Sequence, residues 1–189
     1  MAATAEPSQP ADRRPTVVLV PNAATDAPNV VGLVYVAAFA PDEGEVLGDV
    51  AASSKDSVLM TALVQRGYPT GQGGETATEF LVDPARFREV FAADLPAERA
   101  AVMAATQRPV AAAAFSDVCG PPAWKSLPSW AVVATGDKAA GSDIVRSMAQ
   151  RAGADILEVD GSHVIMVSQP QAVADLIVKA ARAVSPSDR

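Results

Sequence analysis

The sequence predicts an α/β fold in which a mostly parallel sheet is flanked by helices and carries a helical cap insertion. Apolar runs rich in β-branched residues occur at 16–20, 30–37, 130–135 and 156–159. Three of these runs are nearly continuous instead of alternating, which is typical of strands covered on both faces of a parallel sheet. The final third of the chain alternates strand and helix patterns, as βαβ units do.

An amphipathic helix pattern follows each of the last two predicted strands. In the first helix, Ser142 is the predicted N-cap and Gly153 the predicted C-terminal glycine. In the second helix, Ser168 is the predicted cap and Pro170 lies in the first turn. The apolar stripes consist of Ile144, Val145, Met148, Ala149 and Ala152 in the first helix, and of Val173, Leu176, Ile177, Ala180, Ala181 and Val184 in the second.

The middle of the chain, about residues 45–127, has no strong strand signal. It contains a glycine-rich loop at 67–74 and two short predicted helices that begin near Pro84 and Pro96. A helical insertion between two sheet strands predicts a cap over an active site. The periodicity agrees equally well with a helical layer that has no ligand beneath it.

The composition limits the partners of this chain. Its 15 Lys and Arg residues against 22 Asp and Glu residues give a net charge of −7 and form no basic stripe. Such a surface repels a phosphate backbone, so we expect no nucleic-acid partner.

Residues 1–15 are predicted to be a disordered N-terminal tail, and residues 16–189 to be a single domain. The tail has no apolar run that could form a signal-peptide core or span a membrane, so no membrane partner is expected. Cys119 is the only cysteine, which excludes an intrachain disulfide and favours a cytoplasmic location. It has no neighbour at metal-ligand spacing, and we expect neither a metal nor a cofactor.

Several separated segments resemble one family in the same order. They are 34–44, 83–94, 103–109, 128–137 and 159–163, with the sequences VYVAAFAPDEG, DPARFREVFAAD, MAATQRP, PSWAVVATGD and VDGSH. Together they resemble α/β-hydrolases of the small bacterial esterase and hydroxynitrile-lyase type. The resemblance runs from about Asn22 to the C-terminus and implies an incomplete α/β-hydrolase fold.

The resemblance implies two catalytic residues, Asp137 as acid and His163 as base. In this superfamily the nucleophile, the acid and the histidine follow in that order, each beyond the C-terminal end of a strand. His163 is the only histidine, and imidazole is the side chain that titrates near neutral pH. Taken without the resemblance, an Asp after a Gly and a His in a Gly-Ser loop are turn residues.

The nucleophile of the family is missing. No Gly-x-Ser-x-Gly elbow occurs in the 189 residues, and Val20 is joined through Pro21 directly to Asn22. In relatives, an oxyanion turn, further strands and the elbow lie between the corresponding segments. The junction indicates a deletion on the order of 60 residues, at about 30 residues per βαβ unit.

Three side chains are the possible substitutes for that nucleophile. Ser162 is adjacent to His163, and neighbouring side chains generally point apart. Ser129 precedes its strand and should lie at the wrong end of the sheet, while Cys119 is expected to be a small inert thiol. None is a good candidate.

The sequence leaves two functions open. The first is hydrolysis of a small carboxylic ester by a Ser-His-Asp mechanism, which is ancestral and which this chain cannot complete without a nucleophile. The second is a non-catalytic, truncated relic or a binding module. A third reading, hydroxynitrile-lyase-like cleavage of a C–C bond, is disfavoured because Val164 stands where those lyases carry a lysine after the histidine.

The short link between the first two predicted strands affects association. Only nine residues separate Val20 from Val30, which is too few for a parallel crossover. The strand at 30–37 is therefore expected to leave an apolar edge open, and this edge predicts a homodimer.

Overall fold

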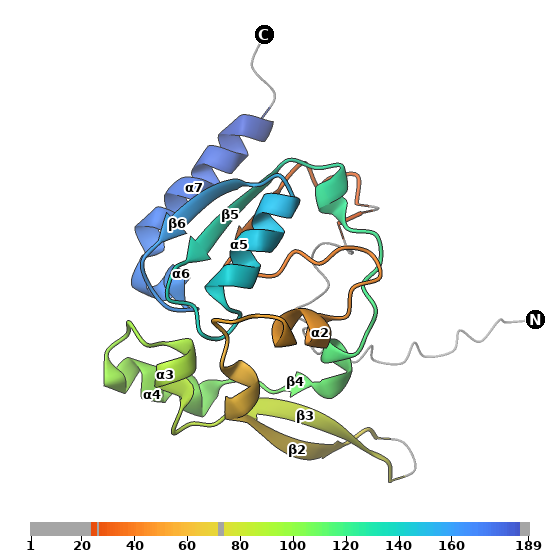
Figure 1. Cartoon of the computed structure of the whole chain (residues 1–189), viewed down its shortest axis with the longest axis vertical. Helices are drawn as coiled ribbons and strands as arrows, with labels where there is room; N and C mark the ends of the chain where they lie inside the picture. Colours follow the sequence, from red (N-terminus) through yellow and green to blue (C-terminus); the bar gives the residue numbers. More distant parts are fainter. Residues whose placement is uncertain (1–23, 26, 72–73, 186–189) are drawn as a thin grey trace, which may run out of the picture.

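The computed structural model describes residues 24–25, 27–71 and 74–185, which contain two three-stranded sheets (Figure 1). The predicted tail at 1–15 and the predicted strand at 16–20 lie outside the described residues.

The central sheet is parallel, with the strand order β1-β5-β6. Its strands are β1 (Leu33–Val36), β5 (Ser129–Ala134) and β6 (Asp155–Val159). Helix α5 (Ser142–Arg151) connects β5 to β6, and α6 (Ile165–Ser168) and α7 (Pro170–Val184) follow β6. The predicted parallel sheet flanked by helices is confirmed.

The two faces of β5 are covered by different helices, α5 and α7, on opposite sides of the sheet (Figure 1). Successive side chains of a strand point to opposite faces. Trp130 and Val132 pack in the cluster that contains the buried side of α7, whereas Ala131 and Val133 pack toward α5. Every residue of β5 is buried, which explains why this strand is apolar without alternation.

The N-terminus of α5 differs from the prediction. Ser142 is the first helical residue, and Gly141 with φ of +90° precedes it. Its hydroxyl donates a hydrogen bond to the Asp56 carboxylate at 2.7 Å, and the same carboxylate accepts the N–H of Asp143 at 3.0 Å. Ser142 is thus not the cap, because a carboxylate distant in sequence satisfies this helix end. Gly153 has the positive φ predicted for it.

The start of α7 also differs from the predicted cap. Pro170 opens the helix as predicted, but Ser168 is the last residue of α6 and provides no side-chain cap. Val173 and Leu176 of the predicted stripe are buried, while Ile177 is largely exposed at the edge of the stripe. None of the helices in the described ranges is both long enough and apolar enough to cross a membrane.

The segment between β1 and β5 is of mixed structure, and most of it lies below the central sheet (Figure 1). We call it the insertion. Its elements are α2 (Leu47–Ala52), η1 (Leu59–Ala62), β2 (Leu63–Pro69), β3 (Thr76–Val82), α3 (Phe87–Phe91), α4 (Ala97–Thr106), β4 (Val110–Ala111), η2 (Ala112–Phe115) and η3 (Ala123–Lys125).

The insertion contains the predicted helices, α3 and α4, but also an antiparallel sheet that the sequence pattern did not predict. Strands β2 and β3 form a hairpin in which Leu63 pairs with Val82 and Pro69 with Thr76, and β4 adds a short third strand. Most of β2 is exposed and Gly67 interrupts it, so it lacks the apolar alternation of a half-buried strand. Pairing with β3 makes it a strand.

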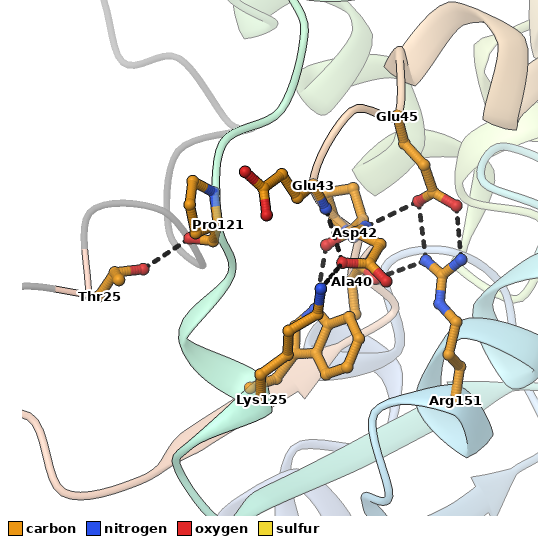
Figure 2. A network of polar contacts seen from close by, with 10 residues as sticks. Thr25, Ala40, Asp42, Glu43, Glu45, Pro121, Lys125 and Arg151 are labelled. Atoms are coloured by element: carbon orange, nitrogen blue, oxygen red, sulfur yellow. Dashed lines mark hydrogen bonds and ion pairs between the residues drawn. The ribbon is translucent and has the colours of Figure 1, made fainter.

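Residues 40–45, which we call the strap, lead from β1 into the insertion and are held by a polar network (Figure 2). Arg151 of α5 forms a two-pronged ion pair with Glu45, with one N–O distance of 2.7 Å, and donates to the Ala40 carbonyl at 3.1 Å. Lys125 forms an ion pair with Asp42. The strap is therefore fixed to α5 on one side and to η3 on the other.

The Glu45–Arg151 pair should make stability depend on pH. Hydrogen bonds from Arg151 hold the pKa of the Glu45 carboxyl below its ordinary value of 4.5, although partial burial opposes this shift. A pKa lowered by folding gives stability that is present above the unfolded-state value and lost as the pH falls through the folded-state value.

We predict that Glu45→Gln lowers the free energy of unfolding by about 0.5–1 kcal/mol at pH 7, because the pair is partly exposed. Urea unfolding should show the difference shrinking between about pH 5 and pH 3. Glu43→Gln, which removes a neighbouring carboxylate outside this pair, is the control and should change little. An equal loss in both variants at every pH would contradict the prediction.

Candidate active site

Asp137 lies just beyond the C-terminal end of β5, and its carboxylate is almost fully buried. Its Oδ1 accepts hydrogen bonds from the backbone N–H groups of Ala139 and Ala140, both at 2.9 Å. A buried carboxylate needs such donors, since leaving it unsatisfied is costly. These two bonds fix the orientation of the carboxyl group and leave Oδ2 for another partner.

That partner is His163, which follows the C-terminal end of β6. The His163 Nδ1 lies 2.8 Å from the Asp137 Oδ2, so the fold brings the two residues named by the family resemblance into hydrogen-bonding contact. Nδ1–H donating to the carboxylate leaves the lone pair of the neutral ring on Nε2. The imidazole is 23% exposed and the carboxylate 1%, so the ring lies between a buried acid and the surface. That these residues are catalytic stays a prediction.

Two glycines bring together the loops that carry Asp137 and His163. The N–H of Gly136 donates to the carbonyl of Gly161 at 2.9 Å. A Cβ at Gly136 would meet that carbonyl oxygen at 3.0 Å, and a Cβ at Gly161 would meet Ile165 Cδ1 at 2.4 Å. A side chain at Gly136 would therefore push the two loops apart, whereas one at Gly161 would crowd Ile165 and Asp94.

The insertion makes two contacts with the loop that carries Ser162 and His163. The ring of Phe91 lies 4.5 Å from the His163 ring, at an angle of 61° between the planes. Asp94 accepts the N–H of Ser162 at 3.0 Å and also the Ser162 hydroxyl. Partial burial raises the pKa of Asp94, but several hydrogen bonds, those from Ser162 among them, together outweigh it and the net shift is downward. The carboxylate form that holds the loop is thereby favoured.

Phe91 and Asp94 were not predicted as site residues, although both lie in the segment 83–94 that carries the family resemblance. No local pattern distinguishes them, because their partners lie about 70 residues away along the chain. Only the folded arrangement shows that they contact the loop bearing His163.

The hydroxyl and thiol groups considered above are directed elsewhere. The hydroxyl of Ser162 bonds to Asp94 and to the Phe91 carbonyl, and that of Ser129 donates to the Leu127 carbonyl at 3.3 Å. Ser129 begins β5 and so lies at the opposite end of the strand from Asp137. Cys119 is buried, and this burial raises the pKa of its thiol. A thiol that resists ionisation is a poor nucleophile.

In the part of the chain that the structure describes, no three His, Cys, Asp or Glu side chains converge as they would on a metal ion.

Comparisons with known proteins agree with the fold described above. The sequence model of the Alpha/beta hydrolase family matches residues 9–176. No curated protein matches the chain.

Several solved structures share the fold. Polyneuridine aldehyde esterase is 16% identical, with a TM-score of 0.63, over 80% of this chain and 62% of its own. An extracellular alpha/beta-hydrolase from a Paenibacillus species is 18% identical, with a TM-score of 0.63, over 83% of this chain and 64% of its own. A methylesterase from Arabidopsis is 17% identical, with a TM-score of 0.60, over 82% of this chain and 60% of its own.

At these identities the similarity shows the fold alone. This chain spans less than two thirds of the length of each of these structures.

The contact of Asp94 with the loop that carries Ser162 and His163 can be tested by hydrogen exchange. We predict that Asp94→Ala raises the exchange rate of the Ser162 amide about tenfold, because that N–H loses its acceptor. Asp94→Asn keeps an acceptor oxygen and should give a smaller increase. Glu98→Ala, an exposed acidic residue on α4, is the control. Unchanged exchange at Ser162 in Asp94→Ala would mean that the contact does not hold the loop.

Proposed function

This chain belongs to the alpha/beta hydrolase family, and from that premise we propose that it derives from a serine esterase acting on small carboxylic esters. In this proposal His163 is the general base and Asp137 the acid that orients it. The chain itself lacks the Gly-x-Ser-x-Gly nucleophile elbow and is inactive.

One observation carries the proposal, the 2.8 Å contact between His163 Nδ1 and Asp137 Oδ2 at the ends of adjacent parallel strands. A carboxylate bonded to Nδ1–H fixes the tautomer in which Nε2 can accept a proton, and it stabilises the imidazolium that forms. The two amides on Oδ1 hold the carboxylate in that orientation.

The proposed chemistry needs a hydroxyl from an elbow above the sheet. The Nε2 of His163 takes the hydroxyl proton while the oxygen attacks the ester carbonyl carbon. The alcohol then leaves with that proton, and an acyl-enzyme remains. Water, deprotonated by the same Nε2, attacks the acyl carbon and releases the acid. Without the hydroxyl, neither covalent step can begin.

Support for an ester as the substrate class comes from the similar structures. Polyneuridine aldehyde esterase and the Arabidopsis methylesterase are esterases by name. We extend only the class to the ancestor of this chain, and propose a small-molecule ester.

The non-catalytic alternative, a relic or a binding module, has its own support. The chain lacks the elbow, yet it keeps a carboxylate whose hydrogen bonds are complete without a nucleophile. The lyase alternative is weaker, since the place after His163 holds the buried, uncharged Val164.

We also propose a cytoplasmic location and a homodimer. The location rests on Cys119, the only cysteine. The dimer rests on β1, which among the described residues pairs on one side only, with β5, and exposes over a third of Val34.

The proposal predicts the outcome of restoring the nucleophile. The 189-residue chain should hydrolyse an aryl ester no faster than its His163→Ala variant. Grafting the oxyanion turn, strands and elbow of the Paenibacillus hydrolase between Val20 and Pro21 should produce turnover, measured by release of the phenol. That turnover should fall at least about 10³-fold with His163→Ala, because the triad acts as a unit.

Two outcomes would contradict the proposal. Activity of the unmodified chain that is abolished by His163→Ala would show that a nucleophile is present. A grafted chain that folds cooperatively but stays inert would remove the support for an esterase ancestor.

A further inference from the structure

The central sheet has an open edge that carries no charge. Among the described residues, strand β1 pairs only with β5, so its other edge has no neighbouring strand. Residues 29–41, which include β1, contain no Asp, Glu, Lys or Arg. Proteins usually protect an open strand edge with charges or proline, because its unpaired backbone groups can pair with another chain.

The other open edges have this protection. Strand β6, at the opposite side of the central sheet, contains Asp155 and Glu158, and both form ion pairs. Strand β2, at the edge of the insertion sheet, contains Arg66 and ends at Pro69. Of the open edges formed by described strands longer than two residues, that of β1 is the one with neither a charge nor a proline.

The backbone of β1 presents two of its residues to the open edge. The N–H groups of Leu33 and Ala37 donate to carbonyls of segment 128–132, both at 3.0 Å. Because the backbone groups of successive residues in a strand point to alternate edges, those of Val34 and Val36 face away from β5. The Val34 side chain is 37% exposed.

Helix α7 continues the uncharged surface beside this edge. Ala174, Ile177, Ala181 and Val184 follow one another at spacings of three or four and lie on one side of the helix, which we call the flank. A Cβ at Gly32, the residue before β1, would meet the Val184 Cγ1 at 3.3 Å. The flank therefore lies toward β1.

The charged side chains of α7 lie on another side of the helix. Asp175, Lys179 and Arg182 form one stripe at i, i+4 and i+7. Lys179 forms an ion pair with Asp155 at the start of β6. This stripe is thus directed away from the open edge of β1.

We propose that two copies of this chain pair through the open edges of their β1 strands, antiparallel about a two-fold axis beside Tyr35. In this register Val34 of one copy and Val36 of the other exchange N–H···O hydrogen bonds, which satisfies the open backbone groups of both strands. The inference rests on the homodimer proposed above and names its interface.

An uncharged edge beside an uncharged flank matches a second copy of itself. Two chains of net charge −7 repel each other, so they associate best where neither carries a charge. Directly opposed residues of antiparallel strands point to the same face, so both α7 helices lie on one face of the joint sheet. Val34 and the 46% exposed Ile177 of each copy are then covered, and the contact is closed by its symmetry.

Sedimentation equilibrium of the 189-residue chain tests the proposal. The chain should show a monomer–dimer equilibrium. Val34→Lys should weaken association at least about tenfold, because it brings like charges of the two copies together beside the axis.

A pair of neighbouring variants on α7 tests the flank. Ile177→Lys should weaken association about tenfold, and its thermal unfolding should be close to that of the unmodified chain, because the side chain is largely exposed. Val178→Lys is the matched control. Val178 is 45% exposed on the same helix but lies outside the flank, so association should change by less than about twofold.

Amide exchange followed by NMR locates the pairing on β1. The Val34 and Val36 amides should exchange at least about tenfold more slowly well above the dissociation constant than well below it. The Leu33 and Ala37 amides, which donate within the chain, should change by less than about twofold.

Several results would overturn the proposal. They are a monomer at every concentration, association unchanged in Val34→Lys and Ile177→Lys, an equal loss in Val178→Lys, or protection of Val34 and Val36 that does not depend on concentration. The last result would mean that the chain's own residues cover the edge. His163→Ala should associate as the unmodified chain does, so failure here is distinguishable from failure of the esterase proposal.

Discussion

The parallel pairing of β5 with β6 determines where Asp137 and His163 lie. With Ala134 opposite Val159, both strands end at the same edge, and the loops that follow start side by side. The Gly136–Gly161 hydrogen bond continues the pairing for one step beyond the strands. A slip of this register would move Asp137 and His163 apart, and it is resisted because β5 is buried on both faces.

The carboxylate of Asp137 is satisfied by the fold itself. Two backbone amides and one imidazole nitrogen account for its hydrogen bonds, so burial at 1% exposure is supported without a substrate or a nucleophile. The pair therefore contributes to the structure of the two loops independently of any catalytic role.

The insertion is coupled to the central sheet at two places. The strap is fixed to α5 by Arg151, and the loop that carries His163 is fixed to the insertion by Asp94. The insertion also forms an apolar pocket that Phe91 lines. The Phe91 ring thus takes part both in this pocket and in the contact with the His163 ring.

The sequence by itself determined the central sheet and its flanking helices, and the family resemblance singled out Asp137 and His163. Continuous burial of β5 and one-sided burial of α7 leave periodic patterns, and Asp137 and His163 follow strands that could be recognised locally. The tertiary structure alone decided the β2–β3 hairpin, the Asp56 contact that replaces the Ser142 cap, and the roles of Phe91 and Asp94. These features depend on partners distant in sequence or on half-exposed strands, and neither leaves a local period. The physical reason is that burial on a regular element repeats along the chain, whereas a single long-range contact does not.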